Sequence, residues 1–223
     1  MPAPDPPTSR KHFLRAVGAT GAAGAAGVLL AACRGDKKRP AATSGGTSNR
    51  GARSRDIEIV NYALTLEYIE ADFYDQVVRS GVVKDRTVLE LAKRFGETER
   101  LHVGALSFAI RGLGGKPAAK PKTAFEHVLA SGPRKVLEVA AMVENLGAAA
   151  YLGQAAQIHD KQILSEALSI HTVEARHAAA LNSLAGKGFR GGALVGSLPD
   201  GAFAKPMGMN EVLKAVKRVI AKD

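Results

Sequence analysis

The sequence TERLHVGAL at residues 98–106 returns as VEARHAAAL at residues 173–181, and this repeat decides the fold. In both stretches a Glu stands three residues before a His, and a Leu follows seven residues after the Glu. On an α-helix, residues three apart are neighbours on one face. The repeat therefore predicts two similar helices, each of which presents a carboxylate and an imidazole on the same side.

Helical periodicity extends this repeat in both directions. Steps of four and three residues connect each Glu and His to apolar side chains, which marks the stripe as the buried face of its helix. Buried charge is costly when it has no partner, so both helices need compensating groups from elsewhere in the chain. The two stripes are Val88, Ala92, Phe95, Glu99, His102, Leu106, Ala109 and Ile163, Ala167, Ile170, Glu174, His177, Leu181, Leu184.

Two further helical segments supply such groups. In each of them a Tyr follows a Glu by seven residues, which is two helical turns or about 10 Å along the same face. The chain thus consists of two similar halves, each a Glu helix followed by a Glu-x-x-His helix. The inward stripes of the Glu helices are Val60, Ala63, Glu67, Glu70, Tyr74, Val77 and Leu137, Ala140, Glu144, Gly147, Tyr151.

Turn and capping residues bound four long helices, and together they predict an all-α four-helix bundle. Short links join the first helix to the second and the third to the fourth, which favours antiparallel pairs. The connection at residues 111–132 is longer and contains the helix-like TAFEHVLA, so it can run back along the bundle. The predicted helices are 56–80 ending at Gly81, 87–112 with a capping box of Thr87 and Glu90, 133–159 with Pro133 in the first turn, 161–186 after an Asp160 cap, and a short closing helix at 210–220.

Four inward carboxylates would repel one another and take up protons unless a cation lies among them. A Glu from each of two helices, with Glu-x-x-His from each of the other two, is the ligand set of di-iron and di-manganese carboxylate bundles. Chance gives about 0.3 Glu-x-x-His pairs for this composition, and two occur. A metal-free network of carboxylates and histidines that stiffens the core is the alternative. The predicted ligands of two iron or manganese ions are Glu67, Glu99, His102, Glu144, Glu174 and His177, with Glu99 and Glu174 placed to bridge.

These paired motifs, with NYALTLEYIEADFY at residues 61–74 and a weaker match in the tail DGAFAKPMGMNEVLKAV at residues 200–216, resemble the ferritin-like superfamily. The resemblance is closest to its bacterial exported branch, which includes desiccation-related proteins. It implies a ferritin-like bundle from about residue 57 onward, with a long crossover between helices two and three. One departure is Glu70, which lies on the inward stripe where the third helix has Gly147. Glu70 is therefore a further candidate ligand, in place of Glu67 or beside it.

The tyrosines of the two Glu helices, Tyr74 and Tyr151, are predicted to be core aromatics first. Their second predicted role is to donate a hydrogen bond or an electron near the metal. The three remaining candidates for ligand histidines, His127, His159 and His171, fall off the stripes or in connections, so they are predicted to be surface or capping residues.

The first 33 residues are predicted to be an export signal. SRKHFLR at residues 9–15 resembles a twin-arginine signal, with Lys11 where a second Arg is usual, so the general secretion route stays open. The apolar run at residues 16–32 is short and broken by glycine for a membrane-spanning helix of about 20 residues. It ends in LAAC, which resembles a lipobox, so Cys33, the only cysteine, is predicted to be lipidated. An uncleaved anchor or an ordinary cleavage site are the alternatives.

Residues 34–55 are rich in Gly, Ser, Ala and Arg without apolar periodicity, which predicts a flexible basic tether. The signal and the tether carry most of the formal charge of +10, and residues 56–223 are nearly balanced. No basic face or nucleic-acid motif is evident, so we expect no nucleic-acid partner. The predicted organisation is a signal at 1–33, a tether at 34–55, a bundle at 56–186 and a tail with a short helix at 187–223.

Function is less determined than the site. An oxygen-rich ligand set with two imidazoles suits iron or manganese and redox chemistry with dioxygen or peroxide. The favoured prediction is an exported protein, lipid-anchored to the cell membrane, that oxidises ferrous iron or removes peroxide. A non-catalytic stress protein with a structural metal is the alternative. Iron storage in a cage is disfavoured because each subunit would carry a lipid tether, and self-association in general stays open.

Overall fold

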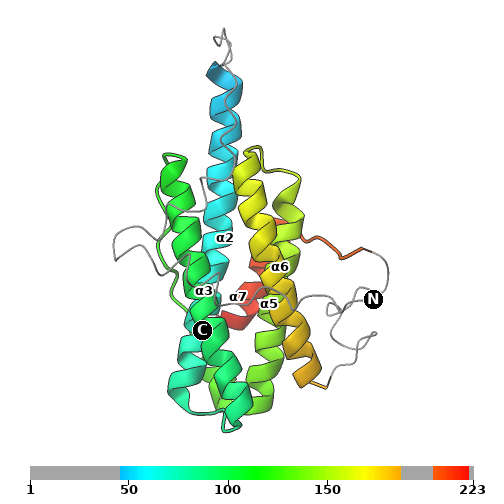
Figure 1. Ribbon diagram of the computed structural model, residues 1–223. Coiled ribbons are helices and arrows are strands. Elements are labelled where there is room, and N and C mark those ends of the chain that lie inside the picture. The colour runs from blue at the N-terminus through cyan, green and yellow to red at the C-terminus, as the bar shows by residue number, and fades with distance from the viewer. Residues whose placement is uncertain (1–45, 187–202, 221–223) are drawn as a thin grey trace, which may run out of the picture. The chain divides into compact units, whose positions relative to one another are not determined.

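The computed structural model describes residues 46–186 and 203–220, and within these ranges it contains helices and no strand. Figure 1 shows α2 beside α3, and α5 beside α6. Contacts between α2 and α5 and between α3 and α6 complete the bundle. The predicted all-α four-helix bundle is confirmed. Its helices are α2 (Gly46–Ser80), α3 (Arg86–Gly112), α5 (Pro133–Ala155) and α6 (Lys161–Leu184).

Several ends of these helices follow the local chemistry of the sequence, and others need correction. The third bundle helix was predicted to reach residue 159, but α5 ends at Ala155 because the chain turns at residues 156–157 into the link before α6. The Asp160 side chain accepts hydrogen bonds from the backbone N–H groups of the first turn of α6, and Pro133 is the first residue of α5, as predicted. The capping box at Thr87 was wrong. Asp85 is the N-cap of α3, because its carboxylate accepts the N–H of Val88 at 2.9 Å, and Thr87 already lies in the first turn. A carboxylate in this place satisfies one of the unpaired donors of the helix end.

The first bundle helix begins ten residues earlier than its apolar pattern indicates. It was expected from about Asp56, but α2 starts at Gly46, so residues 46–55 of the predicted tether are helical. Most side chains from 49 to 55 are exposed, and the burial pattern begins at Asp56. Periodicity cannot reveal a helical turn that buries no face. The rest of the tether, the signal with Cys33, and residues 187–202 of the tail lie outside the described residues.

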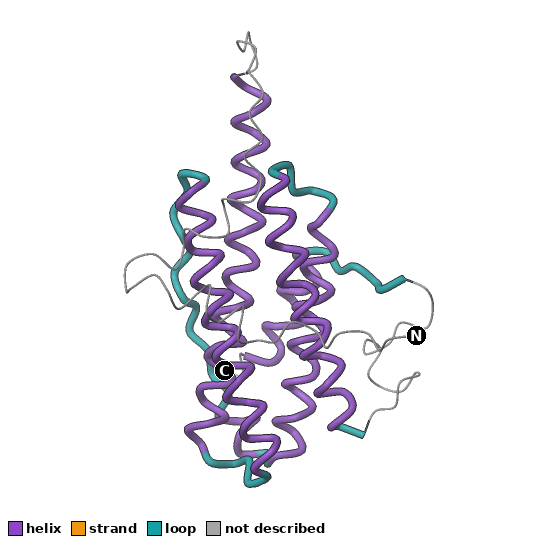
Figure 2. The backbone as a smooth tube through the Cα atoms, viewed as in Figure 1, coloured by secondary structure: helices purple, strands orange, loops and turns teal. Residues whose placement is uncertain are grey.

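The predicted crossover between the second and third bundle helices is confirmed. Figure 2 shows the loop after α3 running back along the helices to the short α4 (Glu126–Ala130). Phe125 and Val128 are buried and fix the end of this connection to the core. Asp72 of α2 fixes its middle, because it accepts hydrogen bonds from Lys120 and Thr123.

The closing helix α7 (Met209–Ile220) packs on α5 and buries Val212 and Val216, so the predicted short C-terminal helix is confirmed. The segment before it crosses α5 closely. The N–H of Met207 donates to the carbonyl of Ala149 at 3.0 Å, and a Cβ placed on Gly153 would lie 2.0 Å from the Met207 carbonyl oxygen. Only glycine leaves room for this crossing.

The core divides into two apolar clusters along the bundle axis. On α2, Ile59, Val60 and Leu64 belong to one cluster, and Phe73 and Val77 to the other. Buried polar side chains lie between these two stretches of the helix. Among the described residues, α5 is the one helix that is long and apolar enough, by length and composition alone, to cross a membrane. However, 56% of its apolar stretch is buried inside the protein. Its role in the core explains its apolar character.

Candidate metal centre

The structure brings the predicted ligand residues of four helices together in the middle of the bundle. Glu67 from α2, Glu99 from α3, Glu144 from α5 and Glu174 from α6 are fully buried. Within the described part of the chain, two sets of four residues could each hold an ion, and in each set the ligand atoms lie within 4.8 Å of one another. The ligands of a single ion, each about 2 Å from it, lie at comparable separations. The sets are Glu67, Glu99, His102, Glu174 and Glu99, Glu144, Glu174, His177.

Two carboxylates, Glu99 and Glu174, belong to both sets. They come from the two Glu-x-x-His helices, which is where the sequence places the bridging residues. Each remaining Glu belongs to one set together with one histidine. The two candidate sets therefore lie next to each other and overlap in their shared carboxylates.

Both histidines turn Nδ1 toward the carboxylates. In the first set, His102 Nδ1 lies 2.9 Å from Glu99 Oε2 and 3.1 Å from Glu67 Oε2. In the second, His177 Nδ1 lies 2.9 Å from Glu99 Oε1 and 3.2 Å from Glu144 Oε2. The same nitrogen of each ring is thus available to its set.

The ring of His177 is held by an aromatic neighbour that periodicity could not assign. Phe95 stacks on it with ring centroids 3.9 Å apart and an interplanar angle of 23°. The sequence placed Phe95 on the inward stripe of α3 only as an apolar residue. Its contact with a histidine of α6 depends on the approach of two helices, which no local pattern reports.

The two tyrosines each bond a carboxylate of the opposite half. Tyr151 of α5 donates its hydroxyl to Glu67 Oε1 at 2.5 Å, and Tyr74 of α2 donates to Glu144 Oε1. Both tyrosines are buried. The sequence predicted that each tyrosine lies on the same face as the Glu of its own helix, Glu67 or Glu144. The structure adds that each tyrosine bonds the Glu of the other helix. Such bonds orient a ligand from outside the coordination sphere.

Glu70 is buried beside the two sets but belongs to neither. Its Oε1 lies 2.9 Å from the place that a Cβ on Gly147 would take, and Glu174 Oε2 lies 2.8 Å from the same place. Gly147 thus leaves the space that both carboxylates occupy. Of the two candidates on α2, the structure places Glu67 within a set and Glu70 next to it.

The cluster has unused acceptors, which is the fit expected for cations. Glu70 Oε2, Glu99 Oε1 and both oxygens of Glu174 are buried and accept no hydrogen bond. Two of them do lie near histidine nitrogens, since His177 Nδ1 is 2.9 Å from Glu99 Oε1 and His102 Nδ1 is 3.3 Å from Glu174 Oε1, but not in hydrogen-bond geometry. Buried carboxylate oxygens without donors are costly, and a bound cation would satisfy them.

The electrostatics of the cluster show the same need. Burial raises the pKa of Glu67 to about 7, and burial with the charges of neighbouring carboxylates raises the pKa of Glu70 and Glu174 well above the ordinary value. Burial would lower the pKa of His102, but Glu174, Glu67 and Glu99 raise it to about 12. Without a cation the cluster therefore retains protons. Divalent ions can replace these protons because metal binding and proton binding compete for the same groups.

The three other histidines singled out by the sequence lie apart from both sets of ligands. His159 has its Nδ1 3.4 Å from Asp56, and the Nδ1 of His171 lies 2.9 Å from the carbonyl oxygen of Ala148. Asp56 also accepts the N–H groups of His159 and Asp160, each at 2.8 Å, so it ties α2 to the link before α6. This buried clamp was missed in the sequence because an isolated Asp carries no motif.

Comparison with known proteins agrees with this architecture. The model of the ferritin-like domain family matches residues 55–187, so the chain belongs to that family. A solved structure of a ferritin-like, diiron-carboxylate protein from Bacillus anthracis str. Ames is similar, with a TM-score of 0.52 and 21% sequence identity. The similarity covers 60% of this chain and 97% of that one, and it shows a shared fold. No curated protein matches the chain.

Proposed function

We propose that this protein holds two iron or manganese ions in its buried carboxylate cluster and uses them to oxidise ferrous iron while dioxygen or peroxide is reduced. One observation carries the proposal: two overlapping sets of ligands share Glu99 and Glu174 in the core of a ferritin-like bundle. The solved relative of similar fold is described as a diiron-carboxylate protein, which supports the choice of centre by analogy.

In this proposal Glu67 and His102 hold one ion, Glu144 and His177 hold the other, and Glu99 and Glu174 contact both. Oxygen ligands with two imidazoles suit iron or manganese. Glu70 lies close enough to the cluster to serve as an additional ligand. When bound, such ions supply electron transfer and Lewis acidity at the site.

The chain's own residues orient and insulate this centre. Tyr151 and Tyr74 hold Glu67 and Glu144 by hydrogen bonds, and Phe95 fixes the plane of the His177 ring. The apolar clusters on either side keep water away, which strengthens electrostatic interactions inside. A fixed, dry arrangement of ligands is what redox chemistry at a metal centre requires from its protein.

The depth of the cluster favours a second candidate, a non-catalytic stress protein of the desiccation-related kind. Its carboxylates are almost completely buried, and of the ligand side chains only those of His102 and His177 reach about a tenth of full exposure. A structural metal needs no access for a substrate. In that case the ions would stabilise the bundle by mass action alone.

Metal analysis combined with aerobic oxidation of ferrous iron separates the two candidates. We expect the purified full-length protein to contain iron or manganese and to oxidise added ferrous iron faster than a variant with His102→Ala and His177→Ala. Metal without any difference in oxidation rate would favour the structural role. Absence of metal from protein expressed with ample iron and manganese would reject both candidates.

We also propose that the protein is exported and lipid-anchored through Cys33, with the basic residues that follow attracted to anionic headgroups. The support is the apolar run that ends in LAAC. Replacing Cys33 by Ala should move the protein from the membrane fraction to the soluble fraction, and joint replacement of Arg10 and Lys11 should block export of a folded reporter if the twin-arginine route is used. Intact-mass analysis that finds a mature N-terminus elsewhere would contradict the anchor.

A further inference from the structure

A small apolar pocket lies at one end of the carboxylate cluster, and the internal repeat of the chain places a second pocket at the other end. The two offsets that relate Glu67 to Glu144 and Glu99 to Glu174 also relate the residues that line the two pockets. The first pocket is lined by Val60, Ala63, Leu106, Tyr151, Ile163 and Ala167, among others. The equivalent residues of the second are Leu137, Ala140, Leu181, Tyr74, Val88 and Ala92.

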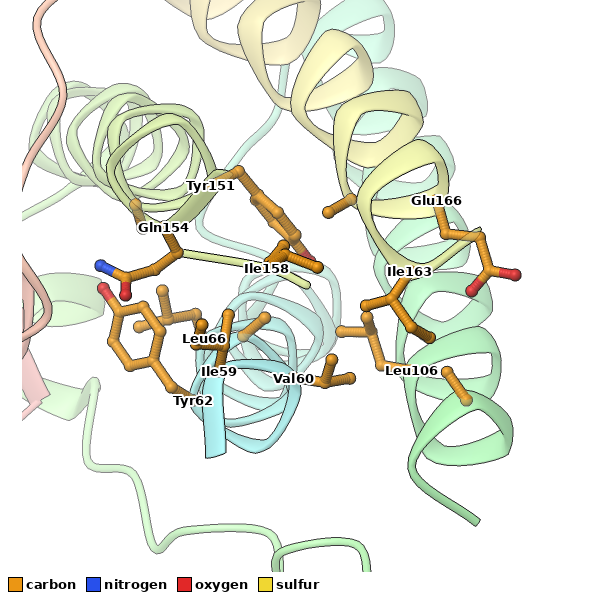
Figure 3. A pocket seen from close by; sticks show the side chains of 14 residues that line it. Ile59, Val60, Tyr62, Leu66, Leu106, Tyr151, Gln154, Ile158, Ile163 and Glu166 are labelled. Atoms are coloured by element: carbon orange, nitrogen blue, oxygen red, sulfur yellow. The ribbon is translucent and has the colours of Figure 1, made fainter. Parts of the chain in front are cut away.

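The first pocket reaches the proposed metal centre at Tyr151. Figure 3 shows the Tyr151 ring reaching between Ile158 and Ile163. The hydroxyl of this ring is the one that donates to Glu67. A molecule in the pocket would therefore lie against the residue that orients a proposed metal ligand.

The two pockets differ in the size of a few equivalent side chains. Ala150 and Ala109 line the first, where Phe73 and Leu184 line the second. With the space at their mouths included, the first spans about 450 Å³ and the second about 370 Å³, while the enclosed centre of each is about 20 Å³. The first pocket therefore differs from the second in the wider space at its mouth and not in the size of its enclosed centre.

The first pocket suits an apolar guest better than water. Its open centre is about 20 Å³, which is room for one small molecule. A buried water needs two to four polar partners. Figure 3 shows the polar ends of Gln154 and Glu166 pointing away from the centre, and the buried Tyr62 hydroxyl, which has no hydrogen-bond partner, lies beside the end of Gln154. The Tyr151 hydroxyl already has its partner in Glu67. Cavities with such linings stay dry and take up apolar guests such as xenon.

We propose that this first pocket binds a small apolar molecule of the size of dioxygen and holds it beside Tyr151 at the edge of the metal centre. The use of dioxygen there rests on the proposed function, but the binding itself depends only on the shape and lining of the pocket. The pocket is then a binding site for the oxidant, separate from the ligand cluster.

Xenon is the probe for this site, since it binds apolar cavities without any chemistry at the metal. Methyl-resolved NMR spectra of the full-length protein under xenon pressure should show shifts at Ala63, Leu106, Ile163 and Ala167. Replacing Ala167 by Leu fills the pocket and should abolish the xenon shifts of the other three methyl-bearing residues. Ala92→Leu is the matched control, because Ala92 is the equivalent residue of the second pocket, and it should leave them unchanged.

Metal content and the dependence of ferrous-iron oxidation on dioxygen are measured on the same samples. Ala167→Leu should keep its metal and raise the KM for dioxygen, with kcat little changed. If Ala167→Leu does not fold, Ala63→Val tests the same point. Absence of xenon shifts in the parent, or equal shifts in the parent and in a folded filling variant, would overturn the pocket even if metal is bound. Xenon binding without metal would leave the pocket standing and reject the proposed function.

Discussion

The two halves of the bundle, α2 with α3 and α5 with α6, build the same cluster from equivalent positions, yet they differ at one decisive pair. Glu67 corresponds to Glu144, but Glu70 corresponds to Gly147. The structure shows that these last two belong together, since the Glu70 carboxylate occupies the space beside Gly147. Glu70, the fifth buried carboxylate of the cluster, thus occupies space that a side chain at position 147 of the other half would fill.

The halves also depend on each other for their hydrogen bonds. Tyr74 of the first half bonds Glu144 of the second, and Tyr151 of the second half bonds Glu67 of the first. Phe95 of α3 stacks on His177 of α6, whereas Ile170 stands at the equivalent position of α6. Neither half can therefore form either candidate set alone, and the surroundings of the two sets are similar but not identical.

The largest effect is expected from the residues that the two positions share. Glu174→Ala removes a carboxylate from both sets, so we expect both ions to be lost. Metal analysis after buffer exchange measures the loss. Glu97→Ala, which removes an exposed carboxylate from α3, is the control and should keep full metal content. Retention of one full equivalent by Glu174→Ala would show that this residue does not serve both positions.

A smaller loss of metal is expected when a ligand is removed from only one of the two sets. His102→Ala and His177→Ala each remove a ligand from a single set, so each variant should keep about one ion while the parent keeps about two. In the metal-free state each should also cost on the order of 1 to 3 kcal/mol, because a buried carboxylate loses its partner. Chemical denaturation after chelation gives this second value. Loss of both ions from either variant would mean that the two positions fill only together.

Comparing the two buried glutamates of α2 tests which of them is the metal ligand. Glu67→Ala should lower the metal content by about one ion, whereas Glu70→Ala should lower it less, because only Glu67 lies within a set. Comparing the two variants by metal analysis under identical loading tests this order. If both keep their full metal content, the ligand assigned on α2 is wrong; if Glu70→Ala loses more, Glu70 is the ligand.

The last and smallest expected effect comes from crowding at Gly147. It is the most specific test of the difference between the halves, in which Glu70 of one corresponds to Gly147 of the other. A Cβ there would lie within 3 Å of oxygens of both Glu174 and Glu70, so Gly147→Ala should destabilise the protein by about 1–3 kcal/mol. Gly104→Ala on α3, where no other atom lies within 4 Å, should be neutral or stabilising. Adding Glu70→Ala to Gly147→Ala should restore part of the loss. A double-mutant cycle without coupling would contradict the shared space.

Much of this cluster could be predicted because its information is local. Each ligand stands at a helical step from apolar residues, so Glu99, His102 and their equivalents in α6 are found from one stripe at a time. The partners that hold them could not be predicted in the same way. The stacking of Phe95 on His177, the crossing of Tyr151 to Glu67 and the room left by Gly147 all depend on distances between helices.

The same distinction applies to the helix boundaries: those set by neighbouring residues could be predicted, and the others could not. Asp160 and Pro133 act through the backbone next to them, and both predictions were confirmed. The start of α2 at Gly46 was missed because its first turns bury no apolar face. The cap of α3 was placed at Thr87, whereas Asp85, two residues earlier in the same short link, is the residue that caps the helix. Propensity alone does not decide between such neighbours.

The most direct test of the two-ion centre is to melt the full-length protein, expressed with ample iron and manganese, before and after exhaustive chelation, with metal analysis of both samples. Ions held only by the folded state add to its stability, so removing them should lower the melting temperature and reloading should restore it. We predict close to two ions per chain before chelation and a clear decrease in melting temperature after it. An unchanged melting temperature, with no metal found beforehand, would contradict the account and leave a bundle stabilised by protonated carboxylates and histidines alone.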